Sequence, residues 1–133
     1  LERIEKNLRK RETLWNRYDR TLQNFPLDLP PAPQPHMRHA RHLYTIRVRK
    51  DSPVGRDRLM ESLHRQNIGT GVHYLPLHLH KYYRETFNYR EGDFPVSEAL
   101  GAATLSLPLS PSLTEKDIDD TVEALRRSFD TPK

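Results

Sequence analysis

A run of prolines constrains this chain more than any other feature of its sequence. The run consists of Pro26, Pro30, Pro31, Pro33 and Pro35. Each proline fixes φ and lacks a backbone N–H, so the segment cannot form a helix interior or a central strand. We expect residues 26–41, which are also rich in His and Arg, to form an extended connector. A ligand for SH3-type domains is the alternative, but no basic anchor adjoins the proline spacing.

The segment before the connector has the periodicity of an amphipathic helix. Apolar residues recur at intervals of three, four or seven, at Leu1, Ile4, Leu8, Trp15, Tyr18 and Leu22. This pattern predicts a long helix over residues 1–25, ending near residue 23. Because Arg11 interrupts the apolar stripe, docking on a neighbouring domain is favoured over a coiled coil.

The segment after the connector reads as a domain over residues 42–129, followed by a tail at 130–133. Residues 42–49 alternate, with Tyr44, Ile46 and Val48 on one side, which predicts a half-buried strand. Residues 54–66 have helical spacing, and Asn67 and Gly69 tolerate the left-handed conformation of a helix end. We expect a second strand at residues 70–75.

The remaining elements are shorter, apart from the last. We expect a helix around residues 79–87, a turn at 91–93, a helix from Pro95 to residue 103, and a strand at 105–109 that Pro108 interrupts. Thr114 and Asp117 resemble a capping box, and apolar residues then recur as far as Phe129. The last segment is therefore predicted to be an amphipathic helix.

Composition limits the kind of protein this can be. Only 35% of the 133 residues are hydrophobic and 30% are charged, so we expect one domain with a thin core and some faces that pack on something outside this chain. The absence of Cys excludes disulfides, thiolate metal sites and a cysteine nucleophile, and suits the cytoplasm. No apolar run is long enough to cross a membrane. Because the chain begins with Leu1 rather than Met, we expect it to be a fragment.

Charge is distributed unevenly along the chain. Residues 1–65 contain 15 Lys and Arg against 8 Asp and Glu, whereas residues 66–133 contain 7 against 10. Such asymmetry can mark a surface that binds nucleic acid. Acidic residues are interleaved with the basic ones of the first helix, which disfavours this interpretation. A stand-alone basic interaction or nucleic-acid-binding module is kept as the alternative function.

The seven histidines are the candidate functional residues. His36, His39 and His42 have a spacing that would align metal ligands on a helix, but the neighbouring proline and strand favour a solvated basic stretch. In residues 73–80, Pro76 could turn His78 back towards His73. That segment could be the rim of a binding site, a metal pair, or simply packed histidine, and no Asp, Glu or Cys between residues 67 and 84 would complete a metal set.

Motifs for hydrolysis and phosphate binding are missing from the sequence. There is no nucleophile elbow, phosphate-binding loop or pair of carboxylates with metal-ligand spacing. Ser106 and Ser110 flank Pro108 without the glycines of a nucleophile elbow. Nothing in the chain assembles a nucleophile, a base and an orienting group.

The order of motifs nevertheless resembles one enzyme family. The motifs are HLYTIRV at 42–48, IGTGVHYLPLH at 68–78, FPVSE at 94–98 and LSLPLSP at 105–111. They resemble the C-terminal small domain of the DegT/DnrJ/EryC1/StrS family, which consists of aminotransferases that use pyridoxal 5'-phosphate (PLP) and act on sugars. The resemblance covers the chain from its first helix to about residue 129.

The resemblance implies a fold and an activity. It implies an α+β domain of two layers, as in aspartate-aminotransferase-like (fold type I) enzymes, with a short, mostly antiparallel sheet packed against helices. The whole enzyme would be a homodimer that moves an amino group, usually from glutamate, onto a keto-sugar attached to a nucleotide. In that family a lysine forms the Schiff base with PLP and an aspartate holds the pyridine nitrogen. Both belong to a large domain that is absent from this sequence.

The resemblance also assigns roles to residues of this chain. The lysines Lys6, Lys10, Lys50, Lys81, Lys116 and Lys133 lack the Schiff-base context, so we expect no catalytic residue, bound cofactor or metal in this chain. His73 is expected to hydrogen-bond to substrate and Tyr74 to form a wall of the site, with His78 and Tyr82 at its rim. The domain would then act as a lid and wall. We expect apolar faces of the first helix and of the sheet to be left for the large domain to cover.

Overall fold

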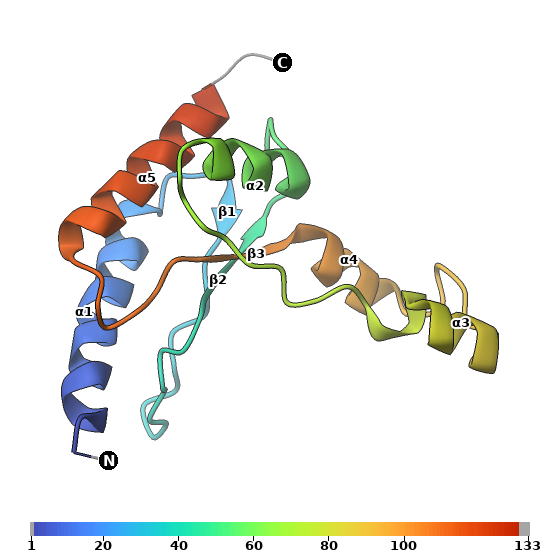
Figure 1. Ribbon diagram of the computed structural model, residues 1–133, viewed down its shortest axis with the longest axis horizontal. Helices are drawn as coiled ribbons and strands as arrows, with labels where there is room; N and C mark the ends of the chain where they lie inside the picture. Colours follow the sequence, from blue (N-terminus) through green and yellow to red (C-terminus); the bar gives the residue numbers. More distant parts are fainter. Residues whose placement is uncertain (1, 131–133) are drawn as a thin grey trace.

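Three helices cover one face of a small sheet. The computed structural model describes residues 2–130 and is shown in Figure 1. The helices α1 (Ile4–Thr21), α2 (Arg56–Arg65) and α5 (Glu115–Asp130) pack against the strands β1 (Leu27–Asp28), β2 (Tyr44–Val48) and β3 (Thr104–Leu107). The strand order is β1-β2-β3 and both pairings are antiparallel. The predicted α+β architecture, with an antiparallel sheet packed on helices, is therefore confirmed.

Alternation along the strands decides which face is covered. Tyr44, Ile46 and Val48 are buried, as predicted, together with Leu105 and Leu107 of β3. The register pairs Thr45 with Ser106, so the intervening side chains share the opposite, polar face. One face of the sheet thus belongs to the core and the other is available for other contacts.

Helix α1 contacts segments near the other end of the chain. Leu14, Trp15 and Tyr18 are buried, and the Tyr18 hydroxyl donates to the Pro108 carbonyl oxygen at 3.0 Å. Arg17 binds Asp119 of α5 through two hydrogen bonds of 2.7 and 2.6 Å. The predicted apolar stripe is buried at Trp15, Tyr18 and Leu22, whereas Ile4 is 53% exposed and Leu1 lies outside the described residues.

The ends of α2 and α5 follow local sequence signals. Asn67, beyond the end of α2, has a φ of 60°, the left-handed conformation expected of it. Gly69 does not share that conformation. Thr114 donates its backbone N–H and its hydroxyl to Asp117 Oδ2, each at 2.7 Å, which confirms the capping box at the start of α5.

The connector contains one short strand. Leu27 and Asp28 pair with Val48 and Arg47, so β1 forms an edge of the sheet, where the nearby prolines are tolerated. Residues 29–43 then run without regular structure to β2. Near the end of this path the guanidinium of Arg41 lies 4.6 Å from the centre of the Trp15 ring, which ties the connector to α1.

An arm, which we define as residues 74–103, extends away from the helices and sheet (Figure 1). It contains the 3-10 helix η1 (Leu77–Leu79) and the helices α3 (Lys81–Phe87) and α4 (Pro95–Ala103), and α4 begins at its proline as predicted. Neither α3 nor α4 has a buried residue. The arm therefore has almost no core of its own.

Two expectations from the sequence are wrong. Residues 70–75 form no strand, and only Gly71 makes a bridge, to Ser106. The chain then leaves β3, and the ring of Pro76 lies against Gly101 of α4. The apolar face of α1 is also largely covered, and the uncovered apolar side chains are concentrated on the arm instead, including Tyr74, Leu75, Leu77, Tyr82, Phe87, Phe94, Val96 and Leu100.

Among residues 2–130, no helix is both long enough and apolar enough to cross a bilayer.

Candidate functional site

The polar face of the sheet carries a row of three hydrogen-bonded side chains. Thr45 Oγ1 lies 2.9 Å from Ser106 Oγ, and Ser106 Oγ lies 3.0 Å from Nδ1 of His73. Ser106 is buried, with 4% of its surface exposed, whereas His73 is exposed. The row therefore connects the interior of the sheet to an imidazole at the surface.

The backbone around His73 is built to let the ring reach Ser106. Gly71 and Ser106 exchange two backbone hydrogen bonds, of 3.1 and 2.8 Å. A Cβ atom at Gly71 would stand 2.8 Å from Cε1 of the His73 ring, closer than such atoms come in practice. Glycine at position 71 thus provides the space that the imidazole occupies.

Tyr74 lies beside this row. Its ring centre is 5.1 Å from that of His73, in an edge-to-face arrangement, and 75% of its surface is exposed. An exposed aromatic ring next to an exposed imidazole can form the wall of a site that binds a ring-shaped ligand. The structure thus places the rings of these two sequence neighbours side by side at the surface, and their contact with substrate stays a prediction.

His78 lies apart from His73, in the interior of the arm. Its Nε2 is 2.7 Å from Oε1 of Glu98, and its ring lies 4.7 Å from that of Phe94. Only 6% of its surface is exposed. The imidazole therefore fixes η1 to α4, and its part in substrate binding stays a prediction.

Glu98 organises the base of the arm. Its carboxylate accepts hydrogen bonds from the backbone N–H groups of Gly92 and Phe94 as well as contacting His78. Desolvation opposes its ionisation, but these amides and the imidazole outweigh desolvation, so the pKa of Glu98 lies below the ordinary value. An ionised carboxylate thus holds together three segments of the arm.

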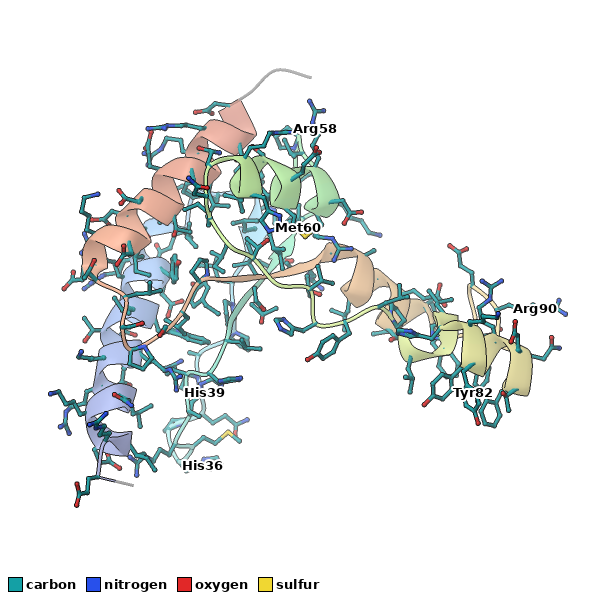
Figure 2. All side chains as sticks on the ribbon, in the orientation of Figure 1. His36, His39, Arg58, Met60, Tyr82 and Arg90 are labelled. Atoms are coloured by element: carbon teal, nitrogen blue, oxygen red, sulfur yellow. The ribbon has the colours of Figure 1, made fainter. Side chains whose placement is uncertain are left out.

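Tyr82 lies on α3, and Figure 2 shows it on the outer part of the arm. Its ring contacts are with Tyr83 and Phe87, and within residues 2–130 it has no ring contact with His73 or Tyr74. Its expected place at the rim stays a prediction. A hollow of about 340 Å³ lies nearby on the arm, lined by Leu77, His78, Tyr83, Phe87, Tyr89, Phe94 and Ser97.

The described residues offer no place for a Schiff-base lysine. Each of the five lysines in residues 2–130 is exposed, and Lys81 and Lys116 face carboxylates on their own helices. None has a hydrogen bond to the row of Thr45, Ser106 and His73. The residues present therefore do not fit PLP. The same part of the chain contains no group of three or more His, Cys, Asp or Glu side chains that could hold a metal ion.

Sequence reasoning missed three residues of this region, namely Thr45, Ser106 and Glu98. The alternation around Thr45 and Ser106 places each on the polar side of its strand, but their pairing depends on a strand register between residues 61 positions apart. Glu98 ends the FPVSE motif and stands in the first turn of a helix, where a carboxylate is common, but neither feature predicts its contacts with His78, Gly92 and Phe94.

Comparison with known sequences identifies similar proteins. Residues 1–126 match the profile of the DegT/DnrJ/EryC1/StrS aminotransferase family. The chain is 40% identical, over 128 residues, to the spore coat polysaccharide biosynthesis protein SpsC of Bacillus subtilis. That match covers 95% of this chain and 33% of SpsC, so the chain spans about a third of the length of the curated relatives it matches.

Comparison with solved structures gives the same result. DesV of S. venezuelae, solved in complex with a ketimine intermediate, superposes with a TM-score of 0.84 at 27% identity, over 100% of this chain and 34% of DesV. Spr1654 of Streptococcus pneumoniae, named as a sugar aminotransferase and solved in its PMP form, gives 0.87 at 25% identity, over 96% and 32%. These neighbours have the type I aminotransferase fold, and this chain matches a third of it.

Proposed function

This chain belongs to the DegT/DnrJ/EryC1/StrS aminotransferase family, and from that premise we propose that it is the C-terminal domain of a PLP-dependent enzyme that aminates a keto-sugar linked to a nucleotide. Its own part is to form a wall of the substrate site and to close over it as a lid. The observation that carries the proposal is the pairing of exposed His73 and Tyr74 within a match that spans 95% of this chain or more in the named relatives.

His73 and Tyr74 have the properties that the wall of a sugar site requires. The imidazole can hydrogen-bond to a sugar oxygen, while the phenol ring offers an apolar surface to the sugar ring. Ser106 holds the imidazole from below, so its orientation does not depend on a ligand. His78 and Tyr82 are proposed as further contacts at the rim. In the bound state these residues would orient the substrate and exclude water from it.

The amino-group chemistry requires residues that this chain does not supply. Because no lysine of residues 2–130 lies at the proposed wall, we place the Schiff-base lysine and the aspartate for the pyridine nitrogen in the remaining part of the polypeptide. A neighbour solved in its PMP form supports a cofactor of this class for the whole enzyme. PLP supplies an electron sink when it is bound.

Partners follow from the same proposal. We propose that the rest of the polypeptide covers the apolar side chains of the arm other than Tyr74 and Tyr82, because α3 and α4 have no buried residue and about two thirds of each relative lies outside the match. A homodimer, glutamate as amino donor and a cytoplasmic location complete the proposal. The relative SpsC is named for spore coat polysaccharide biosynthesis, which supports a sugar as substrate.

The test uses the complete polypeptide that carries this chain. We expect it to bind PLP, seen in the absorption spectrum, and to transfer an amino group from glutamate to a nucleotide-linked keto-sugar. His73→Phe keeps an aromatic ring but cannot hydrogen-bond, and it should raise KM for the sugar about fivefold, the cost of losing one hydrogen bond to the substrate. His36→Phe is the matched control, because His36 lies on the connector (Figure 2).

Two results would overturn the proposal. The first is a polypeptide that neither binds PLP nor aminates any keto-sugar. The second is a His73→Phe variant whose KM equals that of His36→Phe. If the polypeptide instead binds DNA or RNA with an affinity that falls steeply with salt, the alternative of a nucleic-acid-binding module replaces it.

A further inference from the structure

The two hydrogen bonds of the row formed by Thr45, Ser106 and His73 can run in either direction. If Nδ1–H donates to Ser106 and Ser106 donates to Thr45, the Thr45 proton has no acceptor among residues 2–130, whereas the reverse direction leaves no hydroxyl proton of the row without an acceptor. Within residues 2–130, the Thr45 hydroxyl has a single hydrogen-bonding partner, Ser106 Oγ. A hydroxyl has one proton to donate, so if Thr45 donates to Ser106, the Ser106 proton is left for Nδ1 of His73. Nδ1 then accepts, and the proton of the neutral ring resides on Nε2.

His73 Nε2 is the atom that remains available to a ligand. Within residues 2–130 no side chain or backbone group hydrogen-bonds to it, and the residue is exposed. The Cε1 edge of the ring lies over Gly71, where a Cβ atom would stand 2.8 Å from Cε1, 3.4 Å from Nε2 and 3.6 Å from Nδ1, and Nδ1 is engaged by Ser106. The opposite nitrogen is thus the one that a bound molecule can contact.

We propose that Ser106 is a positioning residue that, with Thr45, fixes His73 as an Nε2–H donor aimed at an acceptor oxygen of the substrate. The proposal rests on the proposed function for the identity of that substrate, but the state of the ring can be measured without it. Ser106 touches no substrate itself and acts through His73. The substrate atom that faces His73 Nε2 must then be a hydrogen-bond acceptor, such as a carbonyl, hydroxyl or phosphate oxygen. A group that can only donate, such as an N–H, is excluded.

The first experiment measures the tautomer of His73 by long-range ¹⁵N–¹H NMR on the 133-residue chain, at a pH where the ring is neutral. The signals of His73 are assigned by their loss in His73→Gln. We expect the proton on Nε2 in the native chain. Ser106→Ala should lower the ratio of the Nε2–H to the Nδ1–H form about fivefold, the change that one ordinary hydrogen bond produces.

Three variants separate this role from simple packing. Ser106→Thr keeps the hydroxyl and should preserve the native ratio. Thr45→Val removes the first donor of the row and should lower the ratio without touching Ser106. Gly71→Ala should move the ring away from Ser106, because a methyl group would stand 2.8 Å from it, and should reproduce the Ser106→Ala result with Ser106 intact. If Ser106→Ala prevents folding, Thr45→Val and Gly71→Ala still test whether the row fixes the tautomer of His73.

The outcomes distinguish this proposal from the proposed function. A native His73 ring with its proton on Nδ1 would overturn the positioning role. So would a ratio of the Nε2–H to the Nδ1–H form that is unchanged in Ser106→Ala. If Ser106→Ala does not fold, an unchanged ratio in both Thr45→Val and Gly71→Ala would overturn it. In the complete polypeptide, Ser106→Ala should raise KM for the sugar several-fold while leaving kcat close to native. A polypeptide without aminotransferase activity would refute the proposed function, while the NMR result would still decide the role of Ser106.

Discussion

Replacing Gly101 with alanine tests how the arm is attached. A Cβ atom at this position would lie 2.6 Å from Cδ and 2.8 Å from Cγ of Pro76, and 3.3 Å from the Tyr74 carbonyl oxygen. Pro76 is buried and its ring is rigid, so it cannot rotate away as a long side chain would. The substitution must therefore move the arm or compress the contact.

Two opposing effects set the magnitude. Alanine in place of glycine inside a helix such as α4 would by itself stabilise the protein by about 0.5–1 kcal/mol. Overpacking of a well-filled contact typically costs about 1–3 kcal/mol. We expect the steric cost to win, with a net loss of about 1–2 kcal/mol, unless the arm relieves the strain by loosening. Arg56 opposes loosening, because its guanidinium donates to the carbonyl oxygens of Gly101 and Thr104 at 3.0 and 3.1 Å.

The assay combines urea unfolding with amide hydrogen exchange over the arm. Gly101→Ala should lower the unfolding midpoint, or else accelerate exchange in residues 95–103 by about tenfold or more. Gly69→Ala is the matched control, because no atom lies within 4 Å of a Cβ built there. A Gly101→Ala chain that is as stable as the native one, with unchanged exchange in α4, would refute the reasoning.

Three further predictions concern single positions. Leu105→Ala should lower the free energy of unfolding by about 2–5 kcal/mol, because Leu105 is fully buried, whereas Leu77→Ala, at 59% exposure, should change it little in urea unfolding of this chain. Asn67→Gly should match or exceed native stability and Asn67→Ala should cost about 1 kcal/mol in thermal unfolding, since φ is 60° there. The lowered pKa of Glu98 means that its stabilisation of the arm is complete above the ordinary Glu pKa and is lost as pH falls through the lowered value. The protection of the arm's amides, measured as exchange rates relative to those of free amides at the same pH, should therefore fall on acidification in the native chain and much less in Glu98→Gln, and equal acid responses would count against this role.

Local signals in the sequence determined most of the secondary structure. The prolines set the limits of the connector, the alternation around Ile46 identified β2, and Thr114 with Asp117 located the start of α5. Each of these signals involves only residues that are close in the chain, so it can be recognised from the sequence alone. The predicted strand at residues 70–75 failed because a short alternating segment becomes a strand only where a partner edge is available, and the chain leaves β3 after Gly71.

In the candidate site, too, the sequence predicted some residues and the tertiary structure decided their neighbours. The sequence alone identified His73 and Tyr74 as candidate substrate-binding residues, through the order of the motifs around them. Only the tertiary structure brought Ser106 and Thr45 beneath the imidazole, because the register of β2 against β3 decides which side chains of distant segments meet. The tertiary structure also places the His78 side chain in the interior of the arm, where it contacts Glu98. Periodicity along the chain determines which face a side chain occupies, whereas its neighbours on that face are set by the packing of elements far apart in the sequence.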